Sequence, residues 1–146
     1  MTPVGTVVAA QLCPGHRLPM AARAELRAVA GLGLEDDFHA RGGRRQVLLI
    51  DLEILEALGL KPGQVKENLT VRGIGLQGLP AGTRLQVGSE AVLELTGPCT
   101  PCARMDEIRP GLQAELAGRR GVLARVVRGG LIRVGDPVRV VPDFTP

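Results

Sequence analysis

Short apolar runs separated by glycine-containing turns dominate the chain. The runs cover residues 4–12, 44–51, 68–72, 84–88, 91–96, 122–128 and 137–142. Each run has the length of a single strand, and turns such as V-G-S-E at 87–90 and V-G-D-P at 134–137 separate them. Short strands divided in this way are typical of a sheet that closes on itself or of a sandwich. The pattern therefore predicts a mainly β protein.

Three other segments have the features of short helices, and these are residues 19–30, 52–58 and 111–117. The first is rich in alanine, the second follows Asp51 as a candidate N-cap, and the third has Pro110 near its first turn. Each ends at a glycine, a common helix stop. Because the chain shows no internal repeat, low-complexity tract or linker, we expect one β-rich domain over residues 1–146 with three short helices.

Composition narrows the class of partner. The net charge is +3, and arginine supplies 16 of the 18 basic residues, while the chain has two Phe and no Tyr or Trp. Arginine suits oxyanions because its fork of N–H groups is planar and always charged. The small net charge and the shortage of aromatic residues for base stacking argue against nucleic acid as a partner.

The apolar segments and the number of cysteines indicate the cellular compartment. No segment approaches the length of a membrane span, and the N-terminus lacks the features of a signal peptide. Three cysteines, an odd number, do not form a secreted disulfide framework. We therefore expect a cytoplasmic protein that does not associate with a membrane, with reduced thiols.

The stretch T-G-P-C-T-P-C-A-R at 96–104 holds two of the cysteines, Cys99 and Cys102. Taken alone, a C-x-x-C pair is a redox dithiol, half of a metal site, or a place where one sulfur acts. The redox form favours a helix start within a βαβ unit, whereas this pair follows a predicted strand. For zinc, Cys13 and His16 form a C-x-x-H that would complete a set of three cysteines and one histidine. We keep a structural zinc- or partner-binding module as the alternative function.

Longer blocks of sequence carry a family resemblance. They are L-E-D-D-F-H-A-R-G-G-R-R-Q-V-L-L-I at 34–50, P-G-Q-V-K-E-N-L-T-V-R-G-I-G-L-Q-G-L at 62–79, G-T-R-L-Q-V-G-S-E-A-V-L-E-L-T at 82–96, P-C-A-R-M-D-E-I-R-P-G-L at 101–112 and G-G-L-I-R-V-G-D-P-V at 129–138. In order and spacing they resemble the MOSC domain, named for the C-terminal domain of molybdenum cofactor sulfurase. The resemblance implies a closed β-barrel-like fold, in agreement with the strand pattern.

The resemblance also implies roles for individual residues. Cys102 matches the family's functional cysteine, linked to molybdenum or to carrying sulfur, and Arg104 is expected to favour its thiolate. Asn68 matches an asparagine that helps to hold the pterin cofactor in molybdenum-containing relatives, and Lys66 stands where those relatives can have arginine. His39 matches the histidine of a G-D-x-H-x-G segment, from which this chain departs at both glycines.

An anion site is expected to accompany the cysteine. Arg44 and Arg45 are candidates, and so are the arginines between Arg119 and Arg128. Within that group, Arg125 and Arg128 would face opposite sides of an unbulged strand. We expect these groups to line one concave face together with Lys66 and Asn68.

The expected function is that of a stand-alone MOSC domain protein. It binds molybdenum or a molybdopterin-type cofactor, or it carries sulfur through Cys102, and its partner is a small-molecule cofactor or a sulfur-donor protein. Whether it is an enzyme, sulfurtransferase-like or molybdenum-dependent, the sequence leaves open. Pyridoxal phosphate is not expected, because the two lysines, Lys61 and Lys66, lie in no motif typical of a Schiff base.

Overall fold

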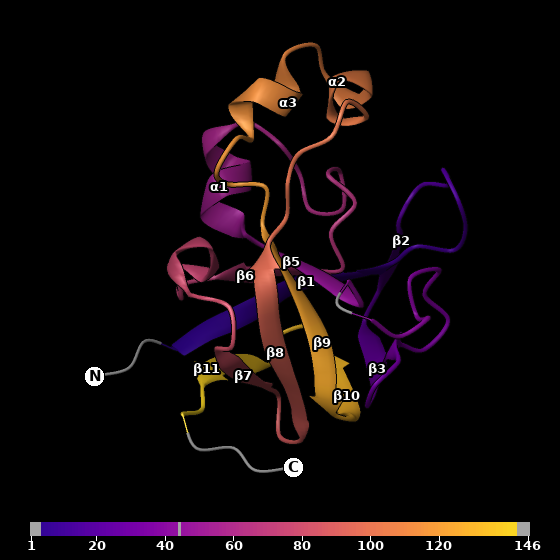
Figure 1. Ribbon diagram of the computed structural model, residues 1–146, viewed down its shortest axis with the longest axis vertical. Helices are drawn as coiled ribbons and strands as arrows, with labels where there is room; N and C mark the ends of the chain where they lie inside the picture. Colours follow the sequence, from indigo (N-terminus) through magenta and orange to yellow (C-terminus); the bar gives the residue numbers. More distant parts are fainter. Residues whose placement is uncertain (1–3, 44, 143–146) are drawn as a thin grey trace.

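A closed barrel of seven strands forms the body of the computed structural model, which describes residues 4–43 and 45–142. The order around the barrel is β11-β7-β8-β9-β5-β6-β1, and β1 pairs with β11 to close it (Figure 1). The strands are β1 (Val4–Leu12), β5 (Val47–Asp51), β6 (Leu69–Arg72), β7 (Arg84–Val87), β8 (Ala91–Pro98), β9 (Val122–Arg128) and β11 (Pro137–Val140). All seven lie on runs that the hydrophobic pattern predicts, so the mainly β, barrel-like prediction is confirmed.

Buried and exposed side chains alternate along the barrel strands, so that one set faces the closed interior. In β9 the side chains of Val122, Ala124 and Val126 are buried, whereas Arg125 is exposed. The same period of two fills the barrel with aliphatic side chains from every strand. A register shift between β8 and β9 inserts one residue before Arg128, so that Arg125 and Arg128 are both exposed. The expectation that these two arginines face opposite sides is therefore wrong.

A second sheet replaces the first predicted helix. Residues 19–30 contain β2 (Ala21–Arg23), which extends the barrel sheet beside β1, and β3 (Glu25–Val29). In a three-stranded sheet, β3 pairs with β4 (Gly33–Leu34) and with β10 (Gly130–Arg133). Leu26 and Ala28 are buried, whereas Glu25 and Arg27 are exposed, which is strand periodicity. Pairing and burial of this apolar face override the helix propensity of alanine, and the helix prediction is wrong here.

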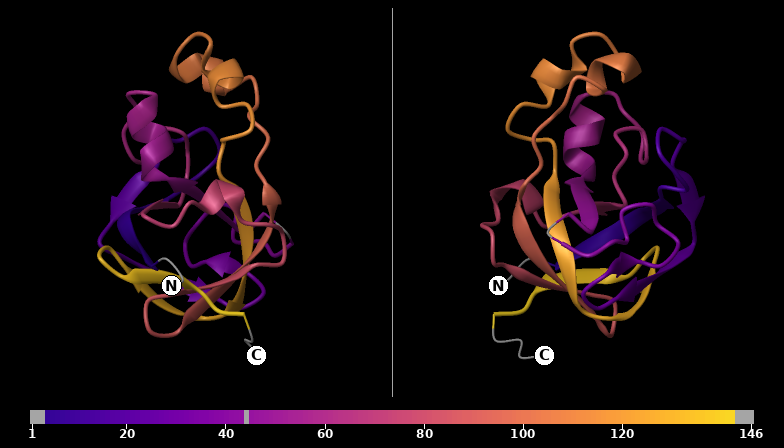
Figure 2. Two further views of the ribbon diagram at one scale, coloured as in Figure 1. Left: turned by 90° about the vertical axis from the view of Figure 1, so that its left-hand side faces the viewer. Right: turned by 45° about the vertical axis from the view of Figure 1, so that its right-hand side comes forward.

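Three short helices lie at one end of the barrel (Figures 1 and 2). They are α1 (Leu52–Ala57), α2 (Met105–Ile108) and α3 (Leu112–Glu115), and a 3-10 turn, η1 (Leu76–Gly78), follows β6. The predictions at 52–58 and 111–117 are confirmed, and the sequence pattern missed α2. The helices cover a second apolar cluster that includes Leu55, Met105 and Leu112. None of the helices in the described residues is long and apolar enough to span a membrane.

Asp51 occupies the N-cap position of α1 without capping it. Its carboxylate accepts hydrogen bonds from the backbone N–H groups of Leu76 (2.8 Å) and Gln77 (3.1 Å), so it fastens η1 to the barrel. Burial raises the pKa of Asp51, although these two hydrogen bonds act in the opposite direction. The side chain serves the tertiary structure rather than the helix start.

Candidate functional site

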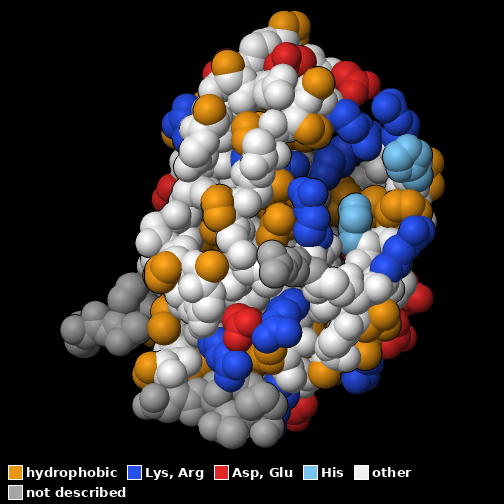
Figure 3. Space-filling view, in the orientation of Figure 1, with side chains coloured by type: hydrophobic (Ala, Val, Ile, Leu, Met, Phe, Trp, Pro, Cys, Tyr) orange, Lys and Arg blue, Asp and Glu red, His pale blue; other side chains and the backbone are white. Residues whose placement is uncertain are grey.

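A pocket of about 360 Å³ opens between the barrel and the helical end. Its walls come from the segment after β1, from the loop before β5, from the segment before β6 and from the chain around α2. The lining residues are Cys13, His16, Arg17, Leu18, Phe38, His39, Lys66, Cys102, Arg104, Met105, Glu107, Ile108 and Arg120. Figure 3 shows basic side chains gathered beside both histidines of the chain at this hollow. The volume falls within the range of small-molecule sites.

Cys102 lies where the chain passes from β8 to α2. The backbone leaves the barrel at Pro98, and the Cys102 carbonyl accepts the N–H of Met105 (3.0 Å) at the start of α2. Its thiol is free and exposed, as the sequence predicts for the accessible cysteine. Cys99 is also free but half-buried, with its Sγ 4.0 Å from Nη2 of Arg45, and it does not line the pocket. The two cysteines therefore have different surroundings.

Positive charge dominates the pocket wall. Among the described residues, four cationic side chains line it, namely Arg17, Lys66, Arg104 and Arg120, and Glu107 is the only carboxylate that does. Glu107 lies 3.8 Å from Arg17 and 3.9 Å from Arg104, both in solvent-exposed pairs. Arg104, expected to act on the Cys102 thiolate, thus has a carboxylate as its ion-pair partner. The pocket keeps a net positive wall, which suits an anionic ligand.

Lys66 and Arg120 are held in place by one short loop. Lys66 has a φ of +69°, a left-handed conformation that a non-glycine residue adopts at a cost, and its N–H bonds the carbonyl of Gly63. The guanidinium of Arg120 donates from Nη2 to the carbonyl of Val65 at 2.6 Å. Arg120 is therefore bonded to the residue that precedes Lys66, and both side chains line the same pocket.

Asp37 connects the histidine segment to the barrel. It accepts hydrogen bonds from the backbone N–H groups of Cys13 (2.6 Å) and His39 (3.1 Å), and His39 Nδ1 lies 3.5 Å away. Burial by itself would raise the pKa of Asp37, but the bonds from His39 and Cys13 lower it below the ordinary value. This carboxylate orients the His39 segment at the pocket edge, where the His39 ring is exposed and meets Phe38 edge-on.

Asn68 is part of the barrel interior rather than of the pocket wall. Its side chain accepts the N–H of Leu48 (3.0 Å) and donates to the Gln11 carbonyl (3.2 Å) and to Asp37 (3.2 Å). The residue is buried and does not line the pocket. Its amide thus joins β1, β5 and Asp37, and its role in holding a cofactor stays a prediction.

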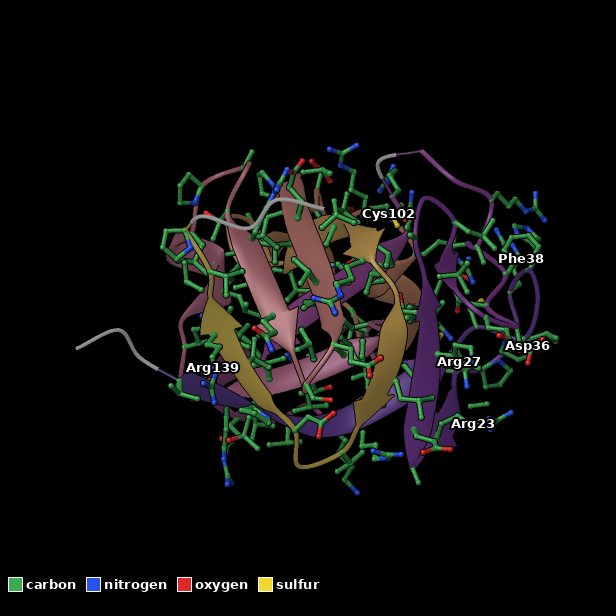
Figure 4. The ribbon with its side chains drawn as sticks, turned by 90° about the horizontal axis from the view of Figure 1, so that it is seen from below. Arg23, Arg27, Asp36, Phe38, Cys102 and Arg139 are labelled. Atoms are coloured by element: carbon green, nitrogen blue, oxygen red, sulfur yellow. The ribbon has the colours of Figure 1, made fainter. Side chains whose placement is uncertain are left out.

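The remaining arginines do not form the single concave face that was expected. Arg44 lies outside the described residues. Arg125 pairs with Glu94 on the outside of the barrel, and Arg119 donates to the Glu115 carbonyl. Arg139 was not one of the expected arginines, and Figure 4, seen from below, places it on β11 across the molecule from Cys102 and Phe38. The pocket brings together several of the predicted residues, namely Cys13, His16, His39, Lys66, Cys102, Arg104 and Arg120.

Phe38 is a pocket residue that the sequence analysis did not single out. Its ring lies 6.1 Å from that of His16, and the guanidinium of Arg41 stacks 4.3 Å above it. The presence of only two phenylalanines in the chain, one of them between the acidic residue and the histidine of D-F-H, was an available signal.

The four proposed zinc ligands do not converge. Cys13, His16 and Cys102 share the pocket wall, but Cys99 does not line it, and the Cys13 thiol donates to the Gly15 carbonyl. Across residues 4–43 and 45–142, no three His, Cys, Asp or Glu side chains group closely enough to hold a metal ion. The structure thus does not assemble the tetrahedral set that a structural zinc site requires.

Solved structures share this fold. The YuaD protein from Bacillus subtilis superposes with a TM-score of 0.82 at 22% identity, covering 94% of this chain and 95% of that one. YiiM from Geobacillus stearothermophilus gives 0.74 at 20% identity, with 94% and 75% covered. YiiM from Escherichia coli gives 0.68 at 18% identity, with 97% and 72% covered. At identities of 18% to 22%, the likeness shows a shared fold and nothing further.

A search of curated proteins returned no significant match. The MOSC domain model, in contrast, matches residues 36–139, a span that contains Cys102 and most of the pocket wall. The matched region runs from the Asp37 segment through the last barrel strand, and the family prediction is confirmed. The chain belongs to the MOSC domain family.

Proposed function

We propose that the pocket binds molybdenum or a molybdopterin-type cofactor, with Cys102 as the sulfur that holds the metal. One observation carries this proposal: a free, exposed thiol lies on the wall of a pocket lined by four cationic side chains. Thiolate is a soft ligand suited to molybdenum, and guanidinium and ammonium groups suit phosphate or oxo groups. Cys102 therefore offers one ligand and its surroundings offer countercharge.

The residues of the pocket fit such a group. Nη1 of the buried Arg120 has no hydrogen-bond partner within the described protein, so an anionic part of the cofactor has a donor available. Lys66 and Arg104 would neutralise further negative charge, and Phe38 with His39 would limit solvent on the other side. When bound, molybdenum would supply redox chemistry. The chain's own residues would bind and orient the cofactor.

A second candidate is sulfur transfer through the same residue, favoured by the exposure of the Cys102 thiol. A sulfur-donor protein would present a persulfide, R–S–SH, at the pocket entrance. The Cys102 thiolate would attack its terminal sulfur, form Cys102–S–SH and release R–S⁻. Cys99 is half-buried beside Arg45, outside the pocket, which favours one reacting sulfur over a dithiol.

We also propose a cytosolic location. The three cysteines are all free, including the exposed Cys102, and a reducing compartment preserves such thiols.

Single substitutions of the two cysteines test the function. The wild-type protein, Cys102→Ser and Cys99→Ser are purified without oxygen, and molybdenum, pterin and persulfide are measured by elemental analysis and mass spectrometry. We expect Cys102→Ser to lose the bound species at least about tenfold and Cys99→Ser to keep most of it, because one thiolate makes the bond.

Equal loss in both variants would contradict the one-sulfur mechanism. Stoichiometric zinc in the wild-type protein, lost from both variants, would support the structural metal module instead.

A further inference from the structure

Arg120 is the most deeply buried cation of the pocket wall. The residue is only 5% exposed, and its Nη2 donates to the Val65 carbonyl at 2.6 Å. Its Nη1 is shielded from solvent and has no partner within the described residues. A buried donor without an acceptor costs free energy, and this one belongs to a residue that lines a pocket.

The charge of Arg120 is also incompletely compensated. Glu67 is a carboxylate close enough to act on this charge, yet within the part of the chain that the structure describes the two side chains form no ion pair within 4.0 Å. Glu67 uses Oε2 for the N–H of Gly63 (2.9 Å) and the hydroxyl of Thr70 (2.7 Å), and its Oε1 is unpaired. Burial lowers the pKa of Arg120, and the nearby Arg45 acts in the same direction, whereas Cys99, Glu67 and Cys102 oppose it. A buried cation that has an unpaired donor and no ion pair is stabilised by a further anion.

The barrel holds this guanidinium close to the thiol segment. Pro98 on β8 pairs with Val122 on β9, and the Cys99 N–H bonds the Gly121 carbonyl at 2.9 Å. Arg120 therefore directly precedes the residue that anchors the T-P-C segment. Arg120 and Cys102 both line the pocket, so an anion that binds the guanidinium there would lie near Cys102.

We propose that Arg120 is the oxyanion-binding residue of the pocket, and that Nη1 binds a phosphate, molybdate or carboxylate oxygen of the ligand beside Cys102. This inference rests on the proposed function in taking the Cys102 pocket as the ligand site. It adds the class of ligand, one that carries an oxyanion group, and the side chain that selects it. Lys66 and Arg104 contribute charge from the pocket edge, and Arg120 contributes the desolvated hydrogen bond.

Calorimetric titration with inorganic phosphate and with molybdate tests the proposal directly. We expect Arg120→Gln to bind phosphate at least about tenfold more weakly than wild type, since a charge-assisted hydrogen bond and its countercharge are lost. Arg119→Gln is the matched control, because Arg119 is the adjacent arginine and does not line the pocket. Equal phosphate affinity in wild type and in a folded Arg120→Gln would overturn the proposal.

Cys102→Ser separates this proposal from the proposed function. Phosphate makes no bond to sulfur, so Cys102→Ser should keep its phosphate affinity even if no molybdenum or persulfide is ever found on Cys102. Molybdate binding that weakens in both Cys102→Ser and Arg120→Gln identifies a free metal oxyanion as the ligand. Binding of both anions that depends on Arg120 alone identifies a phosphate-type group. Either pattern supports the oxyanion site.

Alkylation gives an independent measurement of the same charge. Iodoacetate and iodoacetamide both attach to the Cys102 sulfur and release iodide, but only iodoacetate carries a carboxylate. We follow the alkylation of Cys102 by peptide mass spectrometry and divide the iodoacetate rate by the iodoacetamide rate. This ratio should fall severalfold in Arg120→Gln and stay unchanged in Arg119→Gln. Phosphate should lower the ratio in the wild-type protein. An identical ratio in all three proteins would count against an oxyanion site at Arg120.

Arg120→Lys and arginine side-chain NMR cover the case in which Arg120→Gln does not fold. Lysine keeps the charge but not the paired donors, so a folded Arg120→Lys should retain part of the phosphate affinity. In ¹⁵N-arginine-labelled wild type, the buried Nη1–H should exchange slowly and shift on phosphate addition. Absence of any shift at saturating phosphate would overturn the proposal without any substitution.

Discussion

Glu67 and Arg120 carry opposite charges into one region of the interior, yet their hydrogen-bonding atoms do not meet. Each has one terminal atom bonded to the loop or strand around it and one unpaired atom, Oε1 of Glu67 and Nη1 of Arg120. Glu67 is fully buried, and Arg120 nearly so. An attractive but unbonded carboxylate reduces the cost of burying the guanidinium while leaving its Nη1 for a ligand.

The ionisation of Glu67 makes stability depend on pH. Burial raises the pKa of Glu67 above its ordinary value of 4.5, although hydrogen bonds from Gly63 and Thr70 and the charge of Arg120 oppose this. A raised folded-state pKa gives stability that is fully present below the unfolded-state pKa and is lost as pH rises through the folded-state value.

Glu67→Gln, which cannot ionise, should therefore gain stability relative to wild type as pH rises above about 4.5. Urea unfolding of both proteins between about pH 4 and 8 measures the difference. A difference that stays constant over this range would show that Glu67 does not titrate as its burial predicts.

At the scale of elements, the ladder between β8 and β9 positions the thiol segment relative to Arg120. The ladder ends where Pro98 faces Val122, and the next backbone bond joins Cys99 to Gly121. Gly121 has a φ of +99°, and a Cβ there would lie 2.5 Å from the Leu49 carbonyl oxygen of β5. Only glycine permits this close approach of two strands. Gly121 therefore fixes the position of Arg120, the residue directly before it.

Gly121→Ala should destabilise the fold by about 3 kcal/mol, because a left-handed conformation and a backbone clash both penalise the methyl group. Gly118→Ala is the matched control: its φ is +78°, but no atom lies within 4 Å of the added Cβ. The control should cost only about 1–2 kcal/mol. Thermal or urea unfolding measures both, and equal costs would mean that the contact with Leu49 does not constrain the strand.

For the whole molecule, the interior contains two apolar clusters, and the pocket borders the smaller one through Met105 and Ile108. One cluster fills the barrel, and the smaller one includes residues of α1, α2 and α3, the helices that lie at one end of the barrel in Figure 2. The helical end contributes Met105 and Ile108 to the pocket wall, while the barrel side contributes Arg120. Movement of the helical end would therefore change the opening of the pocket.

Native-state hydrogen exchange should distinguish the two regions. Helices α2 and α3 have four residues each and rest on the smaller cluster, so their amides should exchange faster than those of β5, β8 and β9. A ligand that bridges Arg120 and Cys102 should slow exchange in α2 most. Uniform protection across helices and barrel would show that the molecule opens as one unit.

The sequence alone determined the barrel strands, two of the three helices, the family and the identity of the accessible cysteine. The strands and helices depend on local patterns, such as alternation along a strand and glycine at a turn, whereas the family and its cysteine follow from the resemblance of longer blocks of sequence. The pattern was wrong at residues 19–30, where alanine indicates a helix but the pairing of β3 with β10 and β4 buries Leu26 and Ala28. Long-range pairing outweighs local propensity there, because the strand buries apolar area that an isolated helix would leave exposed.

The tertiary structure alone decided which polar residues lie in the pocket. Asn68 and Arg120 both have candidate roles in the sequence, but Asn68 satisfies its amide with Gln11, Leu48 and Asp37, whereas Arg120, a residue of the pocket wall, keeps one buried donor unpaired. Spacing along the chain cannot distinguish the two cases, because their partners are up to 57 residues away. A side chain is available to a ligand only when the fold has left one of its hydrogen-bonding groups unpaired, and that depends on every strand that packs against it.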